Sequence, residues 1–149
     1  MTIHERYMNI ALTEAELAFD KGEIPVGCVI VFNDTIIAKA HNMVESLKDP
    51  TAHAEIIAIT SAAEYLSSKQ LPGCSVYVTL EPCPMCAGAL VNAKIDCLYF
   101  GAYDHKSGSC GSVINLSSIK SFNHHFPVYG GICDMRSSDL LINFFKVRR

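Results

Sequence analysis

The first twenty residues carry apolar side chains at the spacing of one face of an α-helix. The positions that recur three or four residues apart are Met8, Ala11, Leu12, Ala15, Ala18 and Phe19. Gly22 follows this pattern and offers a stop, because glycine commonly ends helices. The pattern therefore predicts an amphipathic helix over about residues 4–20.

Two β-rich segments follow this helix. Residues 27–32 and 35–40 are rich in apolar and β-branched side chains, and only Asn33 and Asp34 separate them. Two turn-forming residues between two such segments are typical of a hairpin. The sequence therefore predicts two antiparallel strands joined by a tight turn.

From residue 49 onwards, helical and strand-like segments alternate. Asp49, Pro50 and Thr51 are helix-start residues, and apolar side chains then follow one face through Leu66. The further predicted elements are a strand at 75–80, a helix that opens at Pro82 or Pro84 and runs to about residue 93, a strand at 97–101, a fifth strand at 128–133 and a last helix at 137–147. Helical crossovers between strands favour parallel pairing in this half.

These elements predict an α/β fold with three layers, in which helices cover both faces of a mixed five-stranded sheet. Its first two strands form the antiparallel hairpin. A length of 149 residues is typical of one domain, and no repeat or linker divides residues 1–149. The hydrophobic fraction of 50% and the charged fraction of 18% exclude a disordered or collagen-like chain.

The charge balance gives no field that would attract nucleic acid to the whole surface. The formal net charge is -3, so RNA or DNA binding would depend on local clusters. Residues 144–149 form such a cluster, with phenylalanines beside lysine and arginine. Cations at this place also simply complement the dipole at the end of a helix.

The number of cysteines and the length of the apolar segments indicate the cellular compartment of the protein. Seven cysteines is an odd number, and the first twenty residues lack the pattern of a secretory signal. We expect reduced thiols, with Cys28 and Cys97 packed in strands as small core residues. No apolar segment approaches the about 18 residues that span a bilayer, which favours a soluble cytoplasmic protein without membrane contact.

Two short motifs carry the most informative chemistry. His53 and Glu55 lie two residues apart, Cys83 and Cys86 lie three apart, and both pairs are at predicted helix starts. One imidazole and two thiolates are three zinc ligands, and an open fourth position for water is typical of catalytic zinc. Glu55 is placed to take a proton from that water and return it. The motifs therefore predict a hydrolytic zinc site.

Each motif taken alone allows other interpretations. The cysteine pair could be half of a structural zinc site or a redox pair, although the chain holds no second such pair. Glu55 could simply complement a helix dipole. A hydrolase that uses Cys83 as its nucleophile and His53 as its base is a further possibility.

His53, Ala54 and Glu55 combined with Cys83 and Cys86 resemble the signature of the zinc-dependent nucleobase deaminases. The resemblance covers nearly the whole chain, and it is greatest to the bacterial tRNA-specific adenosine deaminases of the cytidine/deoxycytidylate deaminase superfamily. Its other segments are 25–27, 79–81, 86–89, 100–102 and 123–124. It implies a cytidine deaminase-like fold, a homodimer, and conversion of adenosine to inosine at the wobble position of a tRNA anticodon.

The resemblance also implies roles for individual residues. One Zn²⁺ per subunit would be held by His53, Cys83 and Cys86. Glu55 would carry protons from water to the ring nitrogen N1 and to the departing amine. The residues implied to contact the base or the anticodon loop are Asn42, Ala54, Leu80, Asp104, Lys106, Ser107, Asn123, His124, Phe145 and Arg149. Adjacent helix residues face different ways, so we expect Phe145 to be exposed and Phe144 to be packed.

Two other functions share parts of this pattern. A free-base guanine deaminase is also similar at residues 49–55 and at Pro84, where bacterial tRNA deaminases commonly have an aliphatic residue. The loop with Asp104 and Lys106 favours the tRNA enzymes instead. A noncatalytic RNA-binding subunit could keep zinc for structure alone. Such a subunit has no need of Glu55, which this chain retains.

Overall fold

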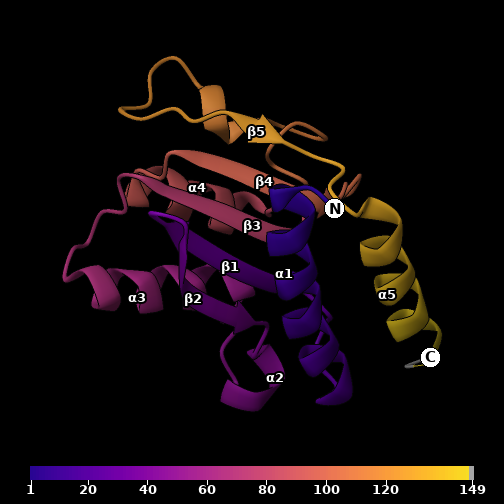
Figure 1. Cartoon of the computed structure of the whole chain (residues 1–149). Coiled ribbons are helices and arrows are strands. Elements are labelled where there is room, and N and C mark those ends of the chain that lie inside the picture. The colour runs from indigo at the N-terminus through magenta and orange to yellow at the C-terminus, as the bar shows by residue number, and fades with distance from the viewer. Residues whose placement is uncertain (148–149) are drawn as a thin grey trace.

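The computed structural model describes residues 1–147 (Figure 1). Its elements are α1 (Ile3–Asp20), β1 (Gly27–Phe32), β2 (Thr35–His41), α2 (Val44–Leu47), α3 (Ala54–Leu66), β3 (Cys74–Leu80), α4 (Pro84–Ala93), β4 (Cys97–Ala102), the 3-10 turn η1 (Leu116–Ser118), β5 (Val128–Tyr129) and α5 (Asp134–Val147). Arg149, which the family resemblance implies to contact the anticodon loop, lies outside the described residues. None of the helices in residues 1–147 combines the length and the apolar character needed to cross a bilayer.

The strands form one mixed sheet in the order β2-β1-β3-β4-β5. β1 is antiparallel to both β2 and β3, whereas β3 with β4 and β4 with β5 are parallel pairs. Asn33 and Asp34 adopt positive φ angles of 49° and 59°, which suits a two-residue hairpin turn. The predicted five-stranded mixed sheet and its opening hairpin are confirmed.

Helices cover both faces of the sheet (Figure 1). α1 packs on β1, β2 and β3, and α5 packs on β4 and against α1. α3 and α4 pack together on the other face, where they share a core with alternate strand residues. Ile30 and Val76 enter this core, whereas Val29 and Tyr77 enter the core under α1. The side chains of the central strands are buried on both faces of the sheet. Polar groups that could act on a substrate are therefore expected at the ends of these strands.

The close packing of α1 on β1 depends on Gly27. A Cβ at this position would lie 1.9 Å from the carbonyl oxygen of Ala11 and 2.7 Å from the nitrogen of Ala15. Only glycine therefore lets the strand approach the helix backbone so closely. The N–H of Gly27 also donates to Oγ1 of Thr79 at 3.1 Å, which ties β1 to β3 at this end of the sheet.

The start of α3 differs from the sequence prediction. The helix expected from about residue 49 begins only at Ala54. Oδ1 of Asp49 accepts hydrogen bonds from the N–H of Thr51 at 2.8 Å and from its hydroxyl at 2.7 Å. This local turn competes with helix formation and delays the first helical turn until after residue 53.

The boundaries of β5 and α5 also differ from the sequence prediction. β5 is limited to Val128–Tyr129, shorter than the predicted strand at 128–133, and α5 begins at Asp134, earlier than predicted. The chain leaves the sheet at Gly130, where a Cβ would lie 2.4 Å from the ring of Phe100. α2 and η1 were not predicted, since elements of three or four residues have no periodicity to detect.

Candidate active site

Two of the predicted metal ligands occupy equivalent places at the starts of α3 and α4. His53 is the N-cap residue of α3, and Cys83 is the N-cap residue of α4. Neither side chain caps its own helix, so both remain available to a metal. Pro84 opens α4 at a position where a missing N–H costs little, and Cys86 follows in the first turn, fully buried.

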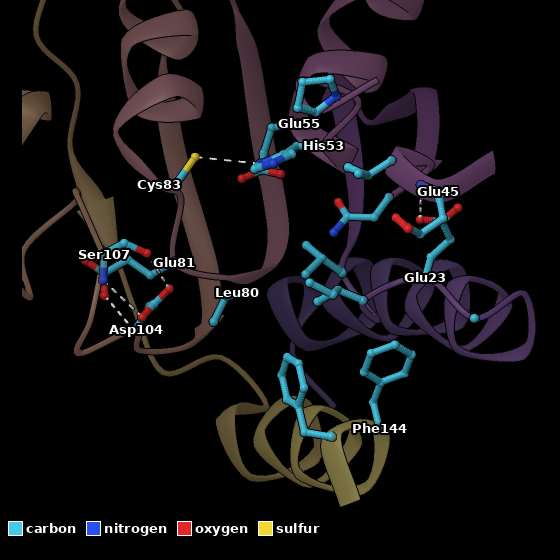
Figure 2. Close-up of a pocket in the computed structure, with 17 residues that line it drawn as sticks. Glu23, Glu45, His53, Glu55, Leu80, Glu81, Cys83, Asp104, Ser107 and Phe144 are labelled. Carbon is cyan, nitrogen blue, oxygen red and sulfur yellow. Dashed lines mark hydrogen bonds between the residues drawn. The ribbon is translucent and has the colours of Figure 1, made fainter. Parts of the chain in front are cut away.

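His53, Cys83 and Cys86 bring three ligand atoms together. Sγ of Cys83 lies 3.6 Å from Nδ1 of His53 (Figure 2), and Sγ of Cys86 lies 3.5 Å from the same nitrogen. All three atoms lie within 4.8 Å of one another, the only such group found in residues 1–147. Zinc bonds of about 2.3 Å to sulfur and about 2.0 Å to nitrogen would place such atoms about 3.5 Å apart in a tetrahedron. The donor set therefore fits zinc and leaves room for a fourth ligand.

The two thiols differ in how readily they ionise. A hydrogen bond from the Cys86 thiol, together with the N–H groups of Cys86 and Met85, lowers the pKa of Cys83 to about 5. The same hydrogen bond, followed by burial, raises the pKa of Cys86. Cys83 is thus the thiol that ionises first, and both thiols must be deprotonated to bind a metal.

Glu55 is the buried carboxyl group of the site. It lies in the first turn of α3 and is 4% exposed. Burial raises the pKa of Glu55 from its usual 4.5 to about 7. The negative charge of Cys83 adds to this rise, whereas a positive charge on His53 opposes it. A carboxyl group that ionises near neutral pH can both accept and donate a proton under working conditions.

We expect Glu55→Gln to stabilise the metal-free protein in a pH-dependent way. The pKa of Glu55 is 4.5 when the chain is unfolded and about 7 when it is folded, so the folded protein prefers the protonated form. Ionised Glu55 then destabilises the fold by about 3 kcal/mol at pH 8, by about half as much at pH 5.5 and by almost nothing at pH 4. The increase in unfolding free energy caused by Glu55→Gln should therefore be largest at pH 8, smaller at pH 5.5 and close to zero at pH 4. Urea unfolding of chelator-treated protein at pH 8 and pH 5.5 measures it.

Glu64→Gln is the matched control for this measurement. Glu64 is exposed and lies on the same helix, so its replacement should change the unfolding free energy little at either pH. An equal stabilisation by Glu55→Gln at both pH values would contradict the raised pKa.

His53, Cys83 and Glu55 line a cleft of about 620 Å³, and Cys86 lies buried beside it. The other sequence-predicted residues in its lining are Asn42, Leu80, Asp104, Ser107 and Phe145. These side chains come from the ends of β2 and β3, the loop after β4, and α5, so segments far apart in the sequence meet around one space (Figure 2). Its volume is within the usual range for small-molecule sites of about 300–1,000 Å³.

Asn42 and Ala54 are joined by a hydrogen bond. The N–H of Ala54 donates to Oδ1 of Asn42 at 2.8 Å, and both residues are buried. Ala54 does not line the cleft; its contribution is to orient the Asn42 amide. Within residues 1–147, Nδ2 of Asn42 donates to no other residue, so it is available to a molecule in the cleft.

Besides Ala54, three residues implied to contact the RNA do not line the cleft. Lys106 is exposed on the loop after β4. Asn123 lines a separate hollow of about 420 Å³ beside α4, and Nε2 of His124 bonds to a backbone carbonyl oxygen at 2.7 Å. On α5, Phe145 is 49% exposed whereas Phe144 is buried, as expected of neighbouring helix residues. The structure therefore brings only some of the predicted RNA contacts together.

Glu23 is a cleft residue that no pattern in the sequence predicted. Its buried carboxylate accepts the N–H of Glu45 at 3.0 Å and both the N–H and the hydroxyl of Ser46 at 2.7 Å, which holds α2 as one wall of the cleft (Figure 2). Burial opposes ionisation, but these hydrogen bonds together keep the pKa of Glu23 below its usual value. A lone acidic residue gives no pattern, so no sequence signal indicated this contact.

A His–Cys–Cys donor set on two helix starts, with a buried glutamate beside it at the ends of a mixed sheet, defines a zinc-dependent hydrolytic deaminase. The chain belongs to the family of the cytidine and deoxycytidylate deaminase zinc-binding region, whose profile matches residues 1–102. The matched part contains both ligand motifs and Glu55.

Similar proteins extend over nearly the full length of the chain. The tRNA-specific adenosine deaminase of Bacillus subtilis (strain 168) is 44% identical over 149 residues, which covers 100% of this chain and 92% of that protein. A solved structure from a study of A-to-I editing by tRNA:A34 deaminases at the wobble position of transfer RNA has a TM-score of 0.88 and 42% identity, covering 91% of this chain and 99% of its own. The guanine deaminase of Bacillus subtilis is less similar, with a TM-score of 0.65 and 31% identity over 80% of this chain and 87% of its own.

Proposed function

We propose that this protein hydrolyses adenosine to inosine at the wobble position of a tRNA anticodon. The observation that carries the proposal is the donor set of His53, Cys83 and Cys86, two of which line one cleft together with the buried Glu55. Full-length similarity to tRNA-specific adenosine deaminases supports adenosine in tRNA as the substrate.

Zinc is the metal that the donor set fits, and we propose one Zn²⁺ per subunit. His53, Cys83 and Cys86 would hold it. When bound, zinc lowers the pKa of a water ligand towards about 7 and so supplies a nucleophile near neutral pH. The remaining steps depend on the side chains of the chain itself.

Glu55 carries out the proton transfers. As a carboxylate it takes a proton from the attacking water while the water oxygen bonds to C6 of adenine, and it passes this proton to N1. The remaining proton of the water then reaches the amine through Glu55, the bond between C6 and the amine breaks, and ammonia leaves inosine behind. A pKa near 7 suits a group that must alternate between the two forms.

The lining of the cleft suits a neutral base better than a phosphate. Among the described lining residues are Glu23, Glu45 and Asp104, and none is a lysine or an arginine. The adenine ring would enter the cleft as a flipped base, with Asn42 available to hydrogen-bond the nucleoside. Phosphates would stay outside, where the exposed Lys106 can meet them.

We also propose that the protein acts as a homodimer in the cytoplasm, the compartment of its tRNA substrate. Exposed apolar side chains on α4 and on the segment after β4 support the dimer, because they offer surface for a second copy. They are Met85, Val113, Ile114 and Phe122. Light scattering of the purified protein measures the oligomeric state.

An anticodon stem-loop with adenosine at the wobble position tests the substrate. We expect the zinc-loaded protein to release ammonia from this RNA and to leave inosine at that position, with little turnover of guanine, adenosine or cytidine supplied alone. The same stem-loop with adenosine moved to a neighbouring loop position is the control. Turnover of guanine with no change in the RNA would contradict the tRNA assignment and favour a guanine deaminase.

A further inference from the structure

Glu81 is a buried carboxylate that the deamination steps do not use. It is 1% exposed and follows directly after the last residue of β3, two residues before Cys83. Its N–H donates to the carbonyl oxygen of Ala102 at 2.9 Å, which fixes its backbone beside the end of β4. Its side chain lies beside Asp104 and Ser107, away from His53 and Glu55 (Figure 2).

Within residues 1–147, the hydrogen bonds of the Glu81 carboxylate all go to one loop, residues 104–112. Oε1 accepts the N–H of Asp104 at 3.0 Å and the hydroxyl of Ser112. Oε2 accepts the N–H of Cys110 at 3.1 Å and the N–H of Ser112 at 2.9 Å. An ionised carboxylate can accept all of these bonds, because its two oxygens offer about four acceptor sites and no donor.

The loop is closely fitted around this carboxylate. A Cβ at Gly108 would lie 2.4 Å from Cδ of Glu81 and 2.4 Å from the carbonyl oxygen of Asp104, so only glycine fits there. The N–H of Ser109 donates to the carbonyl oxygen of Pro82 at 2.9 Å. The segment that carries Cys83 is thus attached to the loop twice, through the side chain of Glu81 and through the backbone carbonyl group of Pro82.

The same loop supplies one wall of the cleft. Asp104 and Ser107 line the cleft. The Asp104 side chain accepts the N–H of Lys106 at 3.0 Å, and it accepts the N–H and the hydroxyl of Ser107 at 3.2 and 3.1 Å. Asp104 therefore shapes the turn from within, while Glu81 fixes the position of the turn relative to the zinc ligands.

We propose that Glu81 is a positioning residue for substrate binding: it holds the 104–112 loop in the form that receives the RNA. This inference rests on the proposed function. Glu81 is not one of the three clustered metal donors, and its oxygens are fully engaged with the loop. Its effect is therefore on the affinity for the substrate and not on proton transfer.

The substitution Glu81→Gln tests this role. The amide keeps the size of the side chain but has one acceptor oxygen, and its NH₂ group would face N–H donors of the loop. Losing such bonds at a buried site should raise KM for the anticodon stem-loop by about tenfold or more. We expect kcat to change by less than about threefold and the zinc content to stay at the wild-type level, since Glu55 and the metal donors are untouched.

Two further variants calibrate the effect. Ser112→Ala removes only the hydroxyl that donates to Oε1, so KM should rise by about two- to threefold. Glu14→Gln is the control: Glu14 is 15% exposed, bonds to His41 at 2.9 Å and does not line the cleft, so KM should be unchanged. If Glu81→Gln fails to fold, the KM of Ser112→Ala tests the proposal in its place, and an unchanged KM would overturn it.

Hydrogen exchange of the loop amides gives an independent measurement. In Glu81→Gln the amides of Asp104, Cys110 and Ser112 should exchange faster, while those of α3 stay protected. An unchanged KM, or a fall in kcat alone, would overturn the proposal, and so would unchanged exchange in the loop. If the wild-type protein does not act on the RNA, the proposed function fails, and the exchange experiment still tests whether Glu81 holds the loop.

Discussion

Glu55→Gln is expected to lower kcat for the anticodon stem-loop by about 10²–10⁴-fold. Glutamine has nearly the shape of glutamate, but its amide cannot take a proton from water or deliver one to the base. Glu55 is not one of the three clustered metal donors, and its carboxylate takes no part in the Asn42–Ala54 hydrogen bond. KM and zinc content should therefore stay close to the wild-type values, which makes the loss specific to the chemical step.

Initial rates over a range of RNA concentrations, together with metal analysis of the same samples, measure this effect. Glu64→Gln should retain full kcat, because Glu64 is exposed on the outer part of α3. Loss of zinc from Glu55→Gln would mean that Glu55 supports the metal and would undermine its role as proton carrier. Full turnover without the carboxylate would exclude the mechanism.

Cys86→Ala is expected to abolish zinc binding and, with it, measurable deamination. The substitution leaves only His53 and Cys83 of the donor set, and two ligands hold zinc far more weakly than three. The fold should remain, because the large apolar core between the sheet and the helices does not depend on the metal. Metal analysis after dialysis, with circular dichroism as a check on folding, tests both parts.

Cys74→Ala is the matched control for Cys86→Ala. Cys74 is also a fully buried free thiol, but it packs in the core of β3. We expect this variant to keep zinc and activity and to lose about 1 kcal/mol of stability. If instead the zinc-free protein were active and thiol alkylation stopped it, Cys83 would act as a nucleophile and the metal mechanism would be wrong.

Much of the fold follows from local patterns. The hairpin was predictable because Asn33 and Asp34 readily adopt positive φ between two apolar segments, and the structure shows both in that form. The first helix was predictable because its buried residues repeat at helical spacing along α1. The metal donors could be found because each short motif holds its ligands within one helix start.

Contacts between distant segments could not be predicted in the same way. Glu23 holds residues 45–46, and Glu81 holds residues 104–112. Each is a single acidic residue without periodicity, and its partners are mostly backbone N–H groups, which every sequence provides. Only the folded chain shows that both carboxylates support walls of one cleft. The contacts assigned to Asn123 and His124 stay predictions.

The position of α3 has a practical consequence for experiments. His53 and Glu55 lie at its beginning, and the helix ends at Leu66, about 20 Å away at 1.5 Å per residue. Residues 67–69, just past that end, are exposed. A fluorescent reporter attached at Lys69 would therefore stand clear of the cleft, and it could follow RNA association in real time without touching the groups that bind or react.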